Sequence, residues 1–176
     1  MLSTLVITLF GADRPGLVEA TAARVASHGG NWLESRLLHL GGHFTGIVRI
    51  EVESSRAAEL ADALRSPGPS GLTIVVHEAR ADWAARPGTQ APATIEVVGH
   101  DRPGIVRAIS HALAARNVNV EELSTERTSA PMSGEPIFQA RATVTFPAGL
   151  DAATLRADLE KIAADLMVDV RFSAKK

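Results

Sequence analysis

The sequence predicts an α+β protein made of two copies of one βαββαβ module. Three observations lead to this prediction: an eight-residue motif that occurs twice, the same order of strand-like and helix-like segments after each copy, and a loop-like segment between the copies. The chain has 176 residues, so each copy has about half of that length, which is near the lower limit for a module that is stable by itself.

The repeated motif reads Gly-Ala-Asp-Arg-Pro-Gly-Leu-Val at residues 11–18 and Gly-His-Asp-Arg-Pro-Gly-Ile-Val at residues 99–106, an offset of 88 residues. The same offset relates Asn31 to Asn119. The match then shifts by six residues, because the second copy carries an extra turn at 129–135. We therefore expect one domain at residues 1–80 and a second at 93–176, joined at 81–92 by a linker that contains Pro and Gly.

In the first copy, hydrophobic periodicity and turn residues give the elements in order. We expect a strand at residues 5–10, a helix with an apolar stripe of Leu17, Val18, Thr21 and Val25, strands at 31–40 and 43–52 joined by Gly41 and Gly42, a helix at 57–65, and a strand at 72–77.

The second copy repeats this order. We expect a strand at residues 95–98, a helix with a stripe of Ile105, Val106, Ile109 and Leu113, strands at 119–127 and 138–146, a helix at 152–166, and a strand at 168–172. The βαββαβ order predicts a ferredoxin-like module, in which an antiparallel four-stranded sheet has both helices on one face. We also expect the two modules to pack against each other.

The composition argues against several classes of function. A net charge of -2 leaves no basic surplus for a phosphate backbone, and 4% aromatic residues leave few platforms for stacked bases. There is no cysteine, no nucleotide-binding loop and no pattern of catalytic nucleophile and base. We therefore expect no catalytic residues, no cofactor, no metal and no direct DNA binding. The N-terminal segment does not resemble a signal peptide and no apolar run has transmembrane length, so we expect a cytoplasmic protein without a membrane partner.

The repeated loop between the first strand and the first helix is the candidate ligand site. Asp13 and Asp101 are placed to cap the helix, with the proline in its first turn. Glycine at 16 and 104 allows close approach, and helix N-terminal amides suit a carboxylate. An ammonium would then need an acceptor, from Asp13 or from Asn31. The candidate ligand-binding residues are Asp13, Arg14, Gly16, Leu17, Asn31, Asp101, Arg102, Gly104, Ile105 and Asn119.

Simpler interpretations remain open for the same residues. The Asp-Arg-Pro-Gly loop also makes a good turn and cap without any ligand. Asn31 and Asn119 are equally suited to a left-handed position between helix and strand. His39 and His43 flank the Gly41-Gly42 turn, but they lack an acidic partner at ligand spacing, so a metal site is not expected there. His100 would contact a ligand only in the second copy, and the simpler interpretation is a solvated loop histidine.

The motif Gly-x-Asp-Arg-Pro-Gly-[Leu/Ile]-Val, followed by a helix and by Asn at the next strand, resembles that of the ACT domain. Two such domains in a chain of this length resemble the glycine cleavage system transcriptional repressor group. The resemblance implies βαββαβ regulatory modules that bind a small amino acid or a related metabolite between two copies. It also implies regulation of glycine cleavage or amino-acid metabolism through a transcription-regulator partner, and it allows a homodimer.

The leading hypothesis is therefore a non-catalytic, ligand-sensing regulatory protein. One alternative is a small enzyme of the same topology, such as an acylphosphatase, although Asp13 and Asp101 would repel a phosphate in the loop. Another is an RNA-binding module, which the aromatic-poor central strands disfavour.

Overall fold

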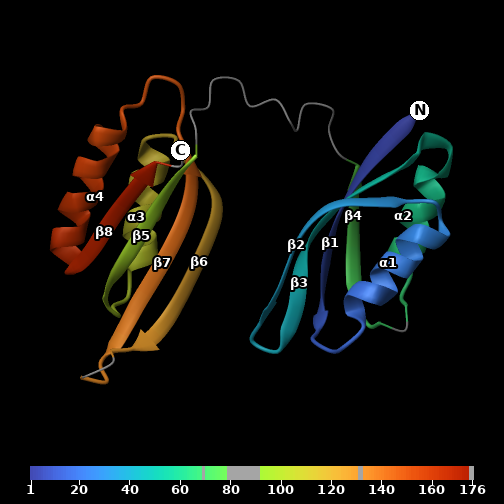
Figure 1. The fold of residues 1–176 in the computed structure, drawn as a ribbon, viewed down its shortest axis with the longest axis horizontal. Helices are drawn as coiled ribbons and strands as arrows, with labels where there is room; N and C mark the ends of the chain where they lie inside the picture. Colours follow the sequence, from blue (N-terminus) through green and yellow to red (C-terminus); the bar gives the residue numbers. More distant parts are fainter. Residues whose placement is uncertain (69, 79–91, 131–132, 175–176) are drawn as a thin grey trace. The chain divides into compact units, whose positions relative to one another are not determined.

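The computed structural model describes residues 1–68, 70–78, 92–130 and 133–174 (Figure 1). It divides the chain into two compact units, Met1–Ala85 and Arg86–Lys176, which we call module 1 and module 2. Most of the expected linker at 81–92 lies outside the described residues. Within the described part of the chain, no helix is long and apolar enough to cross a membrane.

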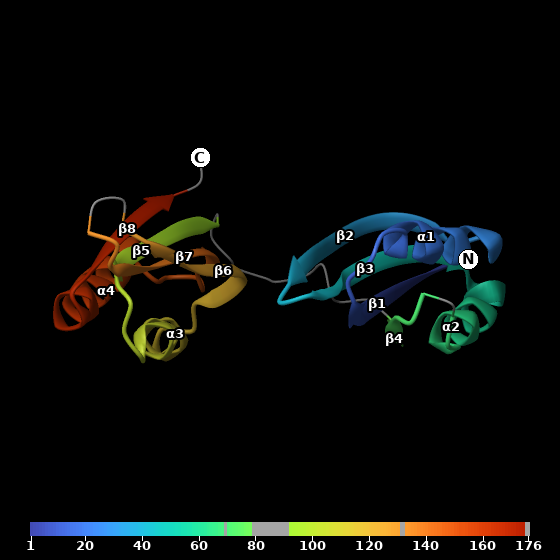
Figure 2. The same ribbon diagram turned by 90° about the horizontal axis from the view of Figure 1, so that it is seen from below.

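Module 1 has the predicted βαββαβ order. Its elements are β1 (Leu2–Ala12), α1 (Leu17–Ser27), β2 (Asn31–Leu40), β3 (His43–Glu53), a short 3-10 turn (Ser54–Arg56), α2 (Ala57–Arg65) and β4 (Thr73–Glu78). The strands form one antiparallel sheet in the order β2-β3-β1-β4, and both helices lie against one face of it (Figures 1 and 2). The ferredoxin-like prediction is confirmed for this module.

Module 2 repeats the arrangement. Its elements are β5 (Ala93–His100), α3 (Ile105–Ala115), β6 (Asn119–Ser129), β7 (Pro136–Thr145), α4 (Ala152–Leu166) and β8 (Val168–Ala174). The sheet order β6-β7-β5-β8 is equivalent to that of module 1, and all pairs are antiparallel. The α+β prediction of two duplicated modules is therefore confirmed.

Each module has its own hydrophobic core between the sheet and the helices. In module 1, alternate residues of β1 point toward the helices, and Leu5, Ile7 and Leu9 are at most 1% exposed. The predicted stripe on α1 is partly wrong. Residues four apart, Leu17, Thr21 and Val25, are buried, whereas Val18 is 46% exposed because it lies about 100° further round the helix. In α3, Val106 is likewise exposed.

In each module, the edge strand that follows the first helix contains a β-bulge at the same place; this strand is β2 in module 1 and β6 in module 2. The register shifts between Trp32 and Glu34 in β2, and between Val120 and Glu122 in β6. One extra residue breaks the two-residue alternation of strand side chains. Consequently Trp32 lies opposite the buried Ile50, and Ser35, three residues later, lies opposite the buried Val48.

The two hairpins at the end of these strands differ in length. Gly41 (φ 59°) and Gly42 (φ 78°) form the two-residue turn of module 1, and positive φ at both positions is what a type I′ turn requires. The hairpin of module 2 is longer, with Ser129 opposite Pro136. Ile47 and Arg141 occupy equivalent sheet positions, which confirms the predicted shift of the second copy.

Candidate functional site at the loop end of each module

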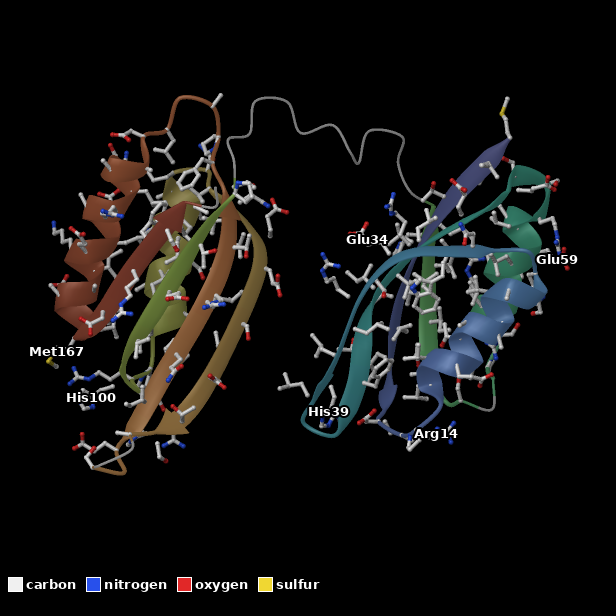
Figure 3. The ribbon with its side chains drawn as sticks, viewed as in Figure 1. Arg14, Glu34, His39, Glu59, His100 and Met167 are labelled. Atoms are coloured by element: carbon white, nitrogen blue, oxygen red, sulfur yellow. The ribbon has the colours of Figure 1, made fainter. Side chains whose placement is uncertain are left out.

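The repeated loop lies at one end of each module, between a hairpin and a helix-to-strand turn. In module 1 the Asp13 N–H donates to the Gly42 carbonyl oxygen at 3.0 Å, which attaches the loop to the β2–β3 turn. The Arg14 guanidinium lies on the other side, 3.7 Å from where a Cβ on Gly71 would be. Figure 3 shows Arg14 and His39 at this same end of the module.

Module 2 holds its loop in the same way. The Asp101 N–H donates to the Pro136 carbonyl oxygen at 3.0 Å. Arg102 Nη2 lies 3.9 Å from the sulfur of Met167, at the turn between α4 and β8. His100 lies 3.7 Å from Glu135 and is exposed. The duplicated sequence therefore builds two loops with the same framework and different neighbours.

The predicted caps are wrong. The residues that precede the helices are Gly16 and Gly104, with φ of 90° and 99°, and neither helix has a side-chain cap. Each glycine adopts a left-handed conformation, and its carbonyl oxygen accepts the first helical hydrogen bond, at 2.9 Å in both modules. Asp13 and Asp101 stand three residues before that point, and the prolines precede the helix. Glycine is needed here for its backbone conformation as well as for space.

This correction gives a testable contrast in stability. Asp151 Oδ1 accepts from the Ala153 N–H at 3.1 Å and is a true cap of α4. Replacing Asp151 with alanine should lower the free energy of unfolding by about 1 kcal/mol, because one amide loses its partner. Replacing Asp13 with alanine should change it by less than about 0.5 kcal/mol, as for most surface sites. Urea unfolding of the two variants checks this, and equal losses would restore Asp13 as a cap.

The two aspartates instead form exposed ion pairs with equivalent residues. Asp13 lies 3.8 Å from His39 Nε2, whereas Asp101 lies 2.8 Å from Arg127 Nε. His39 and Arg127 are related by the same 88-residue offset as the aspartates. Sequence reasoning considered His39 only beside His43, and it missed Arg127. The repeat offset was the signal that could have paired both with the loop.

The other loop residues divide into accessible backbone and buried side chains. A Cβ built on Gly16 or Gly104 would meet no described atom within 4 Å, so the space in front of each helix is open. Leu17 and Ile105 follow directly but are 3% and 2% exposed, so they can offer a ligand only their backbone N–H groups. The N–H groups of the first helical turn have no partner within the helix, and they carry its partial positive charge.

Asn31 and Asn119 do not lie beside these loops. Asn31 pairs with Glu51, which pairs with Thr4, whereas Asp13 directly follows Ala12 at the other end of β1. Along β1, Thr4, which is level with Asn31, and Ala12, which precedes Asp13, are eight residues apart, or about 27 Å. One small ligand therefore cannot contact Asp13 and Asn31 of the same module. Asn119 donates to Glu121 Oε1 at 2.5 Å.

The other predicted role of these asparagines, a left-handed position between helix and strand, is wrong. The left-handed residues after the helices are Gly29 (φ 74°) and Asn117 (φ 54°), two positions before the predicted ones. His43 stacks on Phe10 with ring centroids 5.0 Å apart and does not face His39. No group of three or more metal-ligating residues occurs among the residues that the structure describes.

Each loop places groups of opposite charge close together. Partial positive charge from the helix N-terminus lies next to the carboxylate of Asp13 or Asp101, so a carboxylate and an ammonium would find opposite partners close together. The two modules differ in the side chain that lies beside that aspartate, which is His39 in module 1 and Arg127 in module 2.

Comparisons with known proteins agree with this architecture. The ACT-domain family matches residues 3–77 and again residues 93–163. The glycine cleavage system transcriptional repressors of Escherichia coli (strain K12) and Shigella flexneri are each 28% identical over 162 residues, which cover 92% of this chain and 85% of theirs. The crystal structure of an unknown protein from Galdieria sulphuraria superposes with a TM-score of 0.89 and 28% identity, over 100% of both chains.

The two family matches correspond to the two modules described above and together span most of the chain. The repeated loop motif, the sheet order and the placement of both helices agree with that assignment. The chain therefore belongs to the ACT-domain family and carries two ACT domains in tandem.

Proposed function

We propose that this protein is a non-catalytic sensor of a small amino acid, which regulates amino-acid metabolism by acting on a protein partner. The observation that carries the proposal is the open space in front of Gly16, where helix amides and the Asp13 carboxylate offer opposite charges within one loop. The relatedness to glycine cleavage system transcriptional repressors supports a regulatory role.

In this proposal the ligand carboxylate accepts hydrogen bonds from the N–H groups that follow Gly16. The ligand ammonium pairs with Asp13, because the amide of Asn31 lies at the far end of the same module. Any contribution from Asn31 would have to come from another copy of the module. The Gly104 loop offers the same groups, with Asp101 as the carboxylate.

The partner we propose is a transcription regulator, because the chain itself offers little to DNA. Its net charge is -2, and both modules are ACT domains. Ligand binding would act by linkage: the ligand favours one state of the protein and the partner binds that state better. Among the described residues of the two loops, no side chain is arranged as an activated nucleophile, which favours binding over catalysis.

The test is calorimetric titration of the full chain with a panel of proteinogenic amino acids. We expect at least one small amino acid to bind, and Gly16→Asn to weaken its binding at least about tenfold. Asparagine tolerates the left-handed conformation, so the added side chain blocks approach without a large loss of stability. Gly149 also has positive φ (83°) and open space, so Gly149→Asn is the matched control that should leave binding unchanged. Unchanged affinity in Gly16→Asn and Gly104→Asn would move the sensing site away from these loops.

A further inference from the structure

The two modules differ most on the sheet face that points away from the helices. In module 1 this face exposes a group of large apolar side chains, which we call the apolar face. It consists of Phe10 (52% exposed), Leu38 (51%), Leu40 (74%), Ile47 (52%) and Val75 (47%). The strand register places them side by side on four strands, since Phe10 pairs with Thr45, Thr45 with Leu38, and Thr8 with both Ile47 and Val75.

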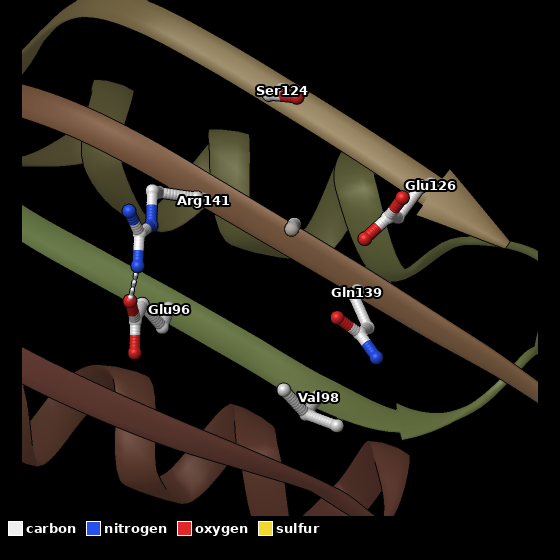
Figure 4. Close-up of a pocket in the computed structure, with 7 residues that line it drawn as sticks. Glu96, Val98, Ser124, Glu126, Gln139 and Arg141 are labelled. Atoms are coloured by element: carbon white, nitrogen blue, oxygen red, sulfur yellow. Dashed lines mark hydrogen bonds and ion pairs between the residues drawn. The ribbon is translucent and has the colours of Figure 1, made fainter. Parts of the chain in front are cut away.

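The equivalent positions of module 2 are mostly polar. The register replaces Leu38 by Glu126, Leu40 by Thr128, Ile47 by Arg141 and Val75 by Arg171, and only Phe10 has an apolar counterpart, Val98. Figure 4 shows this surface, where Arg141 forms an ion pair with Glu96 beside Glu126 and Gln139. These residues line a polar hollow of about 460 Å³. Polar and charged side chains of this kind can stay exposed to water without a partner that covers them.

The contrast shows that the module does not need an apolar open face in order to fold. Both sheets have the same topology and equivalent buried cores, yet module 2 exposes an apolar side chain at only one of these five positions, Val98. Contiguous exposed apolar surface on a soluble protein generally marks an interface. Among residues 1–68 and 70–78, no helix or strand of module 1 lies over this face (Figure 2).

We propose that the apolar face of module 1 is the contact through which two copies of this chain form a symmetric dimer, face to face. A two-fold contact presents the same surface from both sides, and an apolar surface is complementary to itself. The charged residues on the same face are close to balanced, with Glu34, Glu51 and Glu53 against Arg36 and Arg49. Each face therefore carries only a small net charge. The proposal is independent of the ligand.

The sheet surface that carries the apolar face approaches the size that a stable dimer needs. Four strands spaced about 4.8 Å apart, with side chains over five rows of paired residues, cover about 600 Å² of sheet before the relief of the side chains is counted. A stable protein interface buries about 800 Å² on each partner, with its apolar residues in the centre. Phe10, Ile47 and Leu38 lie on adjacent strands at the middle of this area, and Glu34 and Glu51 lie toward its border.

The experiment measures the mass of the full chain by sedimentation velocity across the micromolar range. We expect wild type to be a dimer, and Ile47→Arg and Leu38→Glu to raise the dissociation constant at least about tenfold. Each substitution occurs twice in a symmetric contact and introduces the kind of residue that module 2 already carries. Both positions are about half exposed, so the folded modules should tolerate the changes, which circular dichroism and thermal unfolding verify.

Val98→Arg is the matched control, because it adds a charge to the open face of module 2 at a position that is 40% exposed. It should leave the dimer intact. A wild-type chain that stays monomeric to high micromolar concentration would overturn the proposal, because the apolar face would then be covered within the chain or by another protein. A dimer that survives both Ile47→Arg and Leu38→Glu, or that Val98→Arg dissociates, would overturn it as well.

Discussion

Replacing Gly46 with alanine should lower the free energy of unfolding of module 1 by about 3 kcal/mol, the upper end of the usual cost of overpacking. Gly46 lies in β3 opposite Leu37, and its missing side chain would point toward the core. A Cβ there would lie 2.1 Å from the Arg36 carbonyl oxygen and 2.8 Å from the Leu37 Cα. Both atoms belong to the backbone of β2, so a rotamer change cannot relieve the contact.

Scanning calorimetry of the full chain measures the effect. The matched control is Ala140→Gly, because Ala140 of β7 occupies the position of module 2 that is equivalent to Gly46. That change should cost only about 1 kcal/mol, as expected for glycine inside a regular element. If Gly46→Ala costs no more than its control, the close approach of β2 and β3 in module 1 is not a constraint on stability.

Replacing Asp13 with asparagine should weaken binding of the amino-acid ligand by about 10- to 100-fold, because a charged hydrogen bond contributes about 1.5–3 kcal/mol. Asparagine keeps the shape of the side chain and loses its charge, so stability should change little. The variant therefore separates recognition of the ligand ammonium from packing of the loop. Calorimetric titration with the amino acid that binds wild type gives the affinity.

The matched variant Asp101→Asn should have a smaller effect. Arg127 lies 2.8 Å from Asp101 and is always charged, so it already neutralises that carboxylate. His39 lies 3.8 Å from Asp13 and is charged only when it is protonated. Module 1 should therefore be the stronger site.

His39→Arg reproduces the arrangement of module 2 inside module 1. It should lower the affinity about tenfold, since the new guanidinium competes with the ligand ammonium for Asp13. Equal losses from Asp13→Asn and Asp101→Asn would show that the neighbouring cation does not control recognition at these loops.

The fold could be predicted from the sequence because the same motif and the same order of elements occur twice. Turn residues and apolar periodicity gave β2, α2 and α4 with the observed bounds, and the repeat gave the order of elements. Some strands were predicted too short: β1 was expected at residues 5–10 but spans Leu2–Ala12. Polar or small residues at the end of a strand resemble those of a loop. The side chains of β2 that face the core could not be predicted, since the bulge after Trp32 breaks the alternation.

The repeated loop was predicted as a turn before a helix, which the structure confirms, but the expected roles of its residues in that turn were partly wrong. The motif indicates a turn before a helix, but it does not reveal that Gly16 takes a left-handed conformation and replaces Asp13 as the residue before the helix. The distance between Asn31 and the loop depends on strand direction and register. The repeat offset, from which Asn31 was chosen, carries no information on either. His39 and Arg127 reach the loop from a neighbouring strand, and the repeat offset could have identified them.

The bulge and the hairpin record two stages in the history of the duplicated gene. The bulge occupies the same place in β2 and β6, as expected of a feature that both modules inherited from one ancestral module. The hairpins that follow differ in length, as expected of a change made after the duplication. The pairs below the hairpin are equivalent in the two modules, since Leu40 pairs with His43 as Thr128 pairs with Ile137. Selection on the descendants could therefore reshape the end of the molecule that carries the loops while the inherited sheet stayed the same.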